Sequence, residues 1–218
     1  MLNNKVEVSV LMAVYNTNFS LVKRAVDSVL NQTYPNFEII IIDDGSNNQC
    51  LWKLIEYVQL FEDKISFLQH KNIGQSKSIN RGVQNSKGKY ITILDADDEY
   101  ENNHLELCLN QMENYDLIAS TTQTIVENET DFFVSDKHDT SKLIHVDDCI
   151  LFATLFGKKE IFEKIKFEDK YAADAHFYES ASHFFNTSKI DLRTYKYYRN
   201  NPDSITAKMK QKNNALVI

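Results

Sequence analysis

Two carboxylates separated by one residue, in Asp95-Ala96-Asp97, are the side chains best placed to do chemistry, because they directly follow the apolar run 90–94. Alternate residues of an extended segment point the same way, so the two carboxylates can converge on one cation. Hard oxygen ligands of this kind suit Mg²⁺ or Mn²⁺, and such an ion commonly bridges to substrate phosphates. The pattern alone also fits an acidic surface turn. Its position after a buried strand favours the metal site.

A second acidic pair, Asp43-Asp44, ends the apolar run 37–42 and is followed by Gly45-Ser46. One interpretation is a tight turn in which Ser46 caps a helix. Adjacent charges beside a buried strand are costly unless they are used, so a carboxylate here could instead accept hydrogen bonds from a base or a ribose. The segment 72–82 carries two cations, Lys77 and Arg81, which could meet phosphates or simply face solvent.

Strands and helices alternate over the first hundred residues and must bring these side chains together. Such alternation predicts a parallel sheet with right-handed crossovers, in which a ligand lies beyond the carboxyl ends of the strands. Tyr15 and both acidic clusters fall at those ends, so we expect one site. The expected strands are 6–14, 37–42, 65–68 and 90–94, and the expected helices are about 18–30, 48–61 and 73–84.

The pattern after Tyr100 is less regular. It predicts helices at 105–112, 158–165 and 174–185, strands at 117–119 and 194–198, and an apolar segment at 151–156. We expect an α/β fold, with a mostly parallel central sheet flanked by helices and a smaller section formed by the second half of the chain.

Composition limits the classes of function. The 218 residues carry a net charge of −7, which argues against a nucleic-acid-binding surface. Three widely spaced cysteines form neither a disulfide framework nor a zinc cluster, which favours a reducing cytoplasm. No apolar run approaches the roughly 20 residues that a spanning helix needs, so the chain is expected to be soluble or at most peripheral to a membrane.

Three segments together resemble glycosyltransferase family 2, the inverting enzymes of GT-A fold. They are VSVLMAVYN, SVLNQTYPNFEIIIIDDGS and NIGQSKSINRGVQNSKGKYITILDADD, in the family's order and spacing over roughly the first hundred residues. The later FGKKEIFEKIKF resembles the family more weakly. The resemblance implies a nucleotide-sugar donor, a divalent metal (Mn²⁺ or Mg²⁺) and direct displacement at the anomeric carbon.

The resemblance also implies roles for individual residues. Tyr15 and Asp44 would contact the base, Asp95 would reach the ribose or diphosphate, and Asp97 would bind the metal. YYRNNPDSIT resembles a loop that closes over the diphosphate, and it nominates Arg199 and Ser204. The full nucleotide-sugar-binding set is Ala13, Tyr15, Asp43, Asp44, Lys77, Arg81, Asp95, Ala96 and Arg199.

The family's general base precedes or opens a late helix, and KYAADAHFYE matches that stretch, so Asp174 would be the base. Ala173 replaces the Glu that usually comes before it, and Ile79 stands where the family often has Arg. Asp174 could alternatively cap its helix. Three nearby acids compete for the role of base: Glu168, Asp169 and Glu179.

The resemblance therefore implies a metal-dependent, inverting hexosyl- or N-acetylhexosaminyl-transferase. Residues 1–100 would form its nucleotide-sugar-binding half, and residues 101–218 would form its acceptor-binding and catalytic-base half. A UDP-sugar would be the donor and a glycan or lipid-linked glycan the acceptor, in surface polysaccharide synthesis in the cytoplasm or at the inner face of the membrane. The chain could be cut from a longer polypeptide. The alternative is a non-catalytic sugar-nucleotide-binding or scaffolding domain of a larger synthase, and a phosphoryl-transfer or receiver-type domain fits less well.

Overall fold

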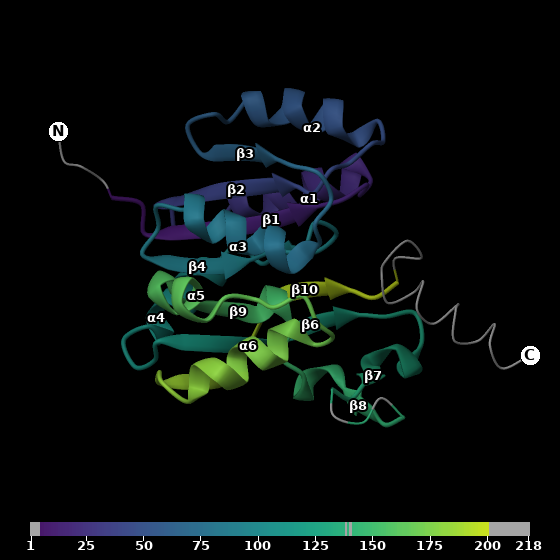
Figure 1. Cartoon of the computed structure of the whole chain (residues 1–218), viewed down its shortest axis with the longest axis vertical. Coiled ribbons are helices and arrows are strands. Elements are labelled where there is room, and N and C mark those ends of the chain that lie inside the picture. Colours follow the sequence, from purple (N-terminus) through teal and green to yellow (C-terminus); the bar gives the residue numbers. More distant parts are fainter. Residues whose placement is uncertain (1–4, 138, 140, 201–218) are drawn as a thin grey trace, which may run out of the picture.

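An eight-stranded sheet runs through the whole of the computed structural model, which describes residues 5–137, 139 and 141–200 (Figure 1). A separate two-stranded hairpin joins β7 (Phe133–Ser135) to β8 (Leu143–His145). The strands of the large sheet, in spatial order, are β3 (Ile65–Gln69), β2 (Phe37–Asp43), β1 (Val8–Val14), β4 (Tyr90–Ile93), β9 (Leu155–Lys158), β6 (Leu117–Ile125), β10 (Thr187–Tyr198) and β5 (Glu99–Tyr100).

Strands β1 to β4 are all parallel, so their carboxyl ends meet at one edge. In this register Val14 pairs with Asp43, and Leu11 pairs with Ile93. β9 runs antiparallel to both β4 and β6, while β6 and β10 are parallel to each other. The mostly parallel sheet expected from the sequence is therefore confirmed.

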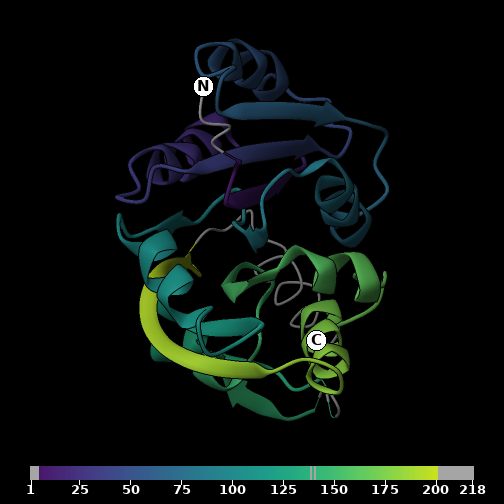
Figure 2. The same ribbon diagram turned by 90° about the vertical axis from the view of Figure 1, so that its left-hand side faces the viewer.

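Helices cover both faces of this sheet (Figure 2). Because successive side chains of a strand point to opposite faces, the mostly apolar and almost fully buried strands β1 and β2 supply two cores. Val10 and Ile41 belong to one core, and Leu11 and Ile40 belong to the other. The first core is covered by α1 (Phe19–Leu30), α2 (Cys50–Gln59) and α4 (His104–Gln111), and the second by α3 (Gln75–Asn85), α5 (Lys159–Ile165) and α6 (Ala173–Ser182).

α1 begins at the polar residues that the sequence indicates. The side chain of Asn18, which precedes the helix, accepts a hydrogen bond from the Ser20 amide. The expected cap at Ser46 is wrong. α2 begins after Gln49, and the Ser46 hydroxyl instead accepts a bond from the Asn16 amide, 2.9 Å away. Ser46 thus joins two strand ends rather than starting a helix.

The second half departs most from expectation at β10, which extends over Thr187–Tyr198 instead of 194–198. Its register against β6 shifts between Ile190 and Tyr195, and Arg193 between them has a φ of 50°. This irregularity is a β-bulge, which bends the strand and strengthens its twist. Within the described residues, no helix is both long enough and apolar enough to cross a bilayer.

Candidate functional site

The loops that follow β1 and β2 are joined by hydrogen bonds at the carboxyl edge of the sheet. Asn16, with a φ of 51°, donates its amide to Ser46, and its side chain accepts from the Asn47 amide at 3.0 Å. Tyr15, just before it, is 51% exposed. The structure thus brings Tyr15 to the edge where β2 ends, with its ring facing solvent.

Asp43 and Asp44 are both buried, and each is hydrogen-bonded to backbone or side-chain N–H groups. The Asp44 carboxylate accepts from the amides of Ile73 at 2.8 Å and Gly74 at 3.0 Å. Asp43 accepts from the Ser46 amide and from the side chain of Gln69, 3.1 Å away. Asp44 therefore joins the end of β2 to the residues that lead into α3, in addition to any role toward a ligand.

Glycine is required at position 45, directly after the two acids. Its φ is +80°, which disfavours any residue with a side chain. A Cβ atom on Gly45 would also lie 2.6 Å from the backbone nitrogen of Asn72. The close passage of two backbones explains why glycine follows the acidic pair.

The carboxylate of Asp95 lies beside the start of α3, where the Gln75 side chain donates a hydrogen bond of 2.8 Å. Burial raises the pKa of Asp95 to about 7, and the negative charges of Asp97 and Asp174 add to this effect. Crowded carboxylates of this kind are suited to a divalent cation, which would offset their repulsion. Ala96, between the two acids, is buried.

The acidic turn, Asp95-Ala96-Asp97, could hold such an ion only if a bound ligand supplied further donor atoms. In the part of the chain that the structure describes, no three His, Cys, Asp or Glu side chains cluster closely enough to hold a metal by themselves. Mg²⁺ is typically held by one or two carboxylates together with substrate phosphates and water. Asp95 and Asp97 match that incomplete donor set.

Asp98 connects this turn to β10. Its carboxylate is fully buried and accepts hydrogen bonds from the Tyr195 hydroxyl and from the Tyr198 amide, the latter at 2.7 Å. Burial, reinforced by the charges of Asp95 and Asp97, raises the pKa of Asp98 well above its usual range. No local pattern in the sequence indicates this contact, because it joins residues almost a hundred positions apart.

Arg199 follows β10 directly and is held by its backbone amide, which donates to Ile125 at 2.9 Å. One guanidinium nitrogen lies 3.4 Å from the carbonyl of Phe133. The Nε and Nη1 atoms are buried, and neither has a hydrogen-bond partner among the described residues. Buried unpaired donors are costly, so this guanidinium is suited to an anionic ligand.

Asp174 is the second residue of α6, and Ala172, with a φ of 52°, occupies the position before the helix. The Asp174 carboxylate accepts from the amides of Phe152 at 3.2 Å and Ala175 at 2.8 Å. Burial raises its pKa, and these hydrogen bonds oppose the rise. β9 runs antiparallel to β4, and Phe152, which donates to Asp174, lies just before β9, so Asp174 lies at the same edge of the sheet as the acidic turn.

The other acids proposed as alternatives to Asp174 form ion pairs on the surface. Glu168 lies 2.6 Å from Lys170, Asp169 lies 3.1 Å from Lys77, and Glu179 lies 2.7 Å from Lys137. Each of these carboxylates therefore already has a lysine partner, whereas Asp174 is bonded to backbone amides.

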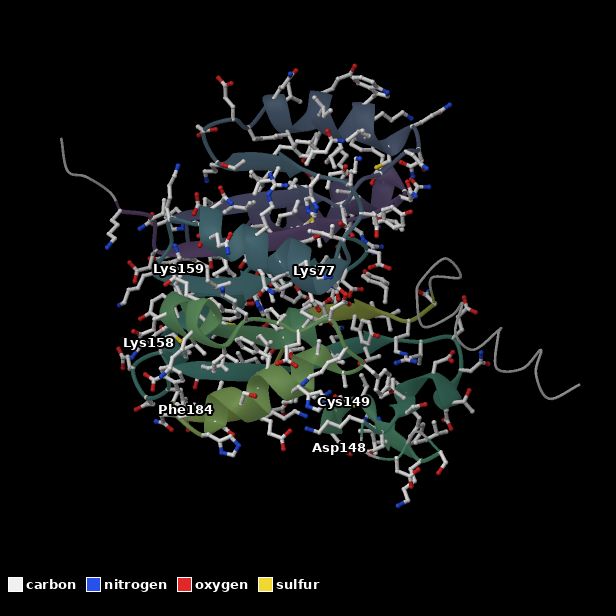
Figure 3. The ribbon with its side chains drawn as sticks, viewed as in Figure 1. Lys77, Asp148, Cys149, Lys158, Lys159 and Phe184 are labelled. Carbon is white, nitrogen blue, oxygen red and sulfur yellow. The ribbon has the colours of Figure 1, made fainter. Side chains whose placement is uncertain are left out.

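The remaining nominated residues have protein partners. Lys77, labelled in Figure 3, projects from α3 toward its partner Asp169. Arg81, one turn later on the same helix, donates to the Gln69 carbonyl at 2.8 Å. Ala13 pairs with Ile42 across β1 and β2, close to the site. Ser204 lies outside the described residues.

Comparison with known proteins places these features in a family context. The sequence model of the family described as "Glycosyl transferase family 2" matches residues 9–170. An uncharacterized glycosyltransferase of Rickettsia prowazekii (strain Madrid E) is 31% identical over 84% of this chain and 60% of its own length. One of Methanocaldococcus jannaschii is 33% identical over 75% of this chain and 59% of its own length. The chain thus spans about three fifths of these relatives.

Solved structures share the fold at low sequence identity. A crystal structure of S. aureus TarS 1-349 in complex with UDP-GlcNAc superposes with a TM-score of 0.70 at 18% identity, covering 92% of this chain and 61% of that one. The mannosyltransferase PcManGT from Pyrobaculum calidifontis, in complex with GDP-Man and Mn²⁺, gives 0.69 at 16% identity, covering 87% and 56%. Together with other such glycosyltransferases, they establish the GT-A type of fold.

Proposed function

Because the chain belongs to glycosyltransferase family 2, we propose that it is the catalytic domain of an inverting transferase that uses a nucleotide-sugar donor. The donor we favour is a UDP-sugar, and the acceptor a glycan or lipid-linked glycan in surface polysaccharide synthesis. The observation that carries the proposal is that Asp174 and the Asp95-Ala96-Asp97 turn lie at the same edge of the sheet: β9 runs antiparallel to β4, so Phe152, which precedes β9 and donates to Asp174, lies beside the end of β4.

In this proposal Asp174 takes the proton from the acceptor hydroxyl as that oxygen attacks the anomeric carbon. A base is more effective as its pKa approaches the working pH, so the raised pKa of Asp174 suits this role. A carboxylate offers about four lone-pair positions, of which the amides of Phe152 and Ala175 use two. The remaining positions can accept the hydroxyl.

Negative charge develops on the departing diphosphate, and Arg199 would stabilise it through its unpaired guanidinium donors. Asp97, together with Asp95, would hold Mn²⁺ or Mg²⁺. Such an ion, when bound, neutralises charge on the phosphate oxygens. Tyr15 and Asp44 would lie beside the base of the nucleotide, with Asp43 supporting Asp44. Lys77 and Arg81 would reach phosphates only after releasing Asp169 and Gln69.

The ligands of the two structural neighbours support parts of this proposal. TarS is in complex with UDP-GlcNAc, which favours UDP, and PcManGT is in complex with Mn²⁺, which favours a divalent metal. The three cysteines are free thiols, which is consistent with the cytoplasmic location we propose, at or near the inner face of the membrane.

Donor turnover by the purified chain tests the proposal. A panel of UDP- and GDP-sugars would be incubated with Mn²⁺ or EDTA, and released nucleoside diphosphate would be measured with and without candidate glycan acceptors. We expect release from one UDP-sugar, faster with an acceptor and absent in EDTA. Nucleotide-sugar binding without any turnover would favour the non-catalytic, scaffolding alternative.

A further inference from the structure

Arg24, in the middle of α1, reaches the turn that contains the acidic pair. Its Nη2 donates a hydrogen bond to the backbone carbonyl of Asp97. Its guanidinium carbon lies 3.9 Å from the centre of the Tyr198 ring, and its Nε lies 4.0 Å from the Glu99 carboxylate. One side chain of α1 thus contacts two segments more than seventy residues away along the chain.

The same turn is joined to the end of β10 by a second set of contacts. The Tyr198 amide donates to Asp98, and the Tyr198 hydroxyl donates to Glu99 at 2.6 Å. Arg199 is the next residue. The acidic turn and the backbone that carries Arg199 are therefore connected directly, and Arg24 contacts both sides of that connection.

The chemistry of these contacts suits arginine. A guanidinium is planar, so it can stack on an aromatic ring while its edge donates hydrogen bonds in the plane. A lysine ammonium is a point charge without a face to stack. The Arg24 Nε is buried and has no hydrogen-bond partner among the described residues. The position of this side chain therefore leaves one of its own donors unsatisfied.

We infer that Arg24 is a positioning residue, which fixes the backbone at Asp97 and, through Tyr198, the end of β10 that carries Arg199. The inference rests on the proposed function, because it assigns a metal to Asp97 and a diphosphate to Arg199. It extends the site to α1, which packs on the opposite face of the sheet from α3 and α6. The metal-dependent part of nucleotide affinity therefore depends on a residue that contacts neither metal nor nucleotide.

Calorimetric titration of UDP into the full chain, in Mn²⁺ and in EDTA, tests this role. Arg24→Met retains an apolar stem against Tyr198 but loses the charge and the donor to Asp97. We expect its UDP affinity in Mn²⁺ to fall about tenfold, equivalent to ~1.4 kcal/mol, and its affinity in EDTA to change less than twofold. Arg24→Lys should regain less than half of the loss in free energy. Lys23→Ala is the matched control, since Lys23 is an exposed neighbour paired with Asp27, and its UDP affinity should not change.

Tyr198→Leu removes the stacking partner and the hydroxyl bond to Glu99 but keeps the backbone bond from residue 198 to Asp98, and it should lose Mn²⁺-dependent affinity in the same way. Unchanged affinity of both Arg24→Met and Tyr198→Leu in Mn²⁺ would overturn the inference. Full recovery of UDP affinity by Arg24→Lys would also overturn the inference, because charge alone would then suffice. Equal losses of affinity in Mn²⁺ and in EDTA would overturn it as well. A wild-type chain that gains no UDP affinity from Mn²⁺ contradicts the proposed metal itself, so that failure is distinguishable from failure of the role of Arg24.

Discussion

The Asp174 carboxylate experiences two opposed effects. Burial disfavours its charged form, while the amides of Phe152 and Ala175 favour it. Burial is the larger effect, and the pKa is raised. The consequence is a carboxylate that is a stronger base than a surface aspartate and is still held in a fixed orientation.

Replacing Asp174 with Asn separates a base from a structural role. If Asp174 is the base, transfer should fall by ~10²–10⁴-fold while UDP-sugar affinity stays nearly constant, because Asn cannot take the proton. Phe152 and Ala175 donate to different carboxylate oxygens, so the single Asn oxygen can keep only one of these bonds, and the free energy of unfolding should fall by ~1–3 kcal/mol. Steady-state transfer assays and calorimetric donor binding measure both effects. Asp169→Asn, which alters an exposed neighbour, should transfer at a near-normal rate, and near-normal transfer by Asp174→Asn would assign the base to another carboxylate.

Asp44→Ala should weaken binding of UDP and of the UDP-sugar by similar factors, because we assign Asp44 to the nucleotide rather than to the sugar. The amides of Ile73 and Gly74 would also lose their acceptor, at a cost of ~1–3 kcal/mol in the free energy of unfolding. Calorimetry and urea unfolding measure the two effects, with Asp63→Ala as the exposed control. Normal UDP binding combined with reduced turnover would refute the assignment.

At the scale of elements, α4 is joined to β10 by a buried histidine. His104, the first residue of α4, stacks on Tyr100 with ring centroids 3.8 Å apart, and its Nδ1 lies 2.7 Å from the Thr194 hydroxyl. Burial lowers the pKa of His104 to about 3 from an ordinary value of 6.5. The ring therefore stays neutral in the folded protein at moderately acidic pH.

This burial predicts a loss of stability in acid. Below pH ~6.5 the unfolded chain binds a proton at His104 that the folded chain does not, so the free energy of unfolding falls by up to ~1.4 kcal/mol per pH unit, until about pH 3. The raised pKa values of Asp95, Asp98 and Asp174 act in the opposite sense, so the effect of His104 is measured as a difference between variants. In urea unfolding from pH 7.5 through 6.0 to 5.0, the wild type should lose free energy of unfolding relative to His104→Asn. The exposed His183→Asn should retain the wild-type slope, and an equal slope in His104→Asn would contradict the prediction.

β1 to β4 and α1 to α3 could be predicted from sequence to within about two residues, because β1, β2 and β4 are almost fully buried and the helices have one apolar face. The two-residue strand β5 was too short to leave a pattern. The longer β10 could not be predicted, since residues 187–192 are polar or half-buried and the bulge at Arg193 interrupts the alternation. The position of β9 between β4 and β6 depends on pairing between distant segments, which no local pattern contains.

The residues of the candidate site also differ in how far the sequence could predict them. Asp43, Asp44, Asp95 and Asp97 could be predicted because each follows a buried strand in a parallel sheet. Asp174 was predicted only through the family resemblance. The contacts of Gln75 with Asp95, Asp98 with Tyr195, and Arg24 with Asp97 have no sequence signal, because each depends on tertiary packing.

For the whole molecule, the decisive feature is one sheet shared by both halves of the chain. β4 from the first half pairs with β9 from the second, and β5 pairs with β10. The proposed donor site uses Asp97 from the first half and Arg199 from the second. A donor bound there would contact both halves, so binding and global unfolding should be coupled.

Scanning calorimetry tests this coupling. A ligand at a hundred times its Kd stabilises a folded protein by ~2.7 kcal/mol, which for a domain of this size raises Tm by about 5–10 °C. We expect one unfolding transition, shifted by that amount with UDP and Mn²⁺ and by much less with UDP and EDTA. Asp97→Ala should lose the Mn²⁺-dependent part of the shift, because the ion would lack its carboxylate, and should keep the smaller shift seen in EDTA. Two separate transitions would contradict coupling through one sheet, and equal shifts in Mn²⁺ and EDTA would contradict the metal at Asp97.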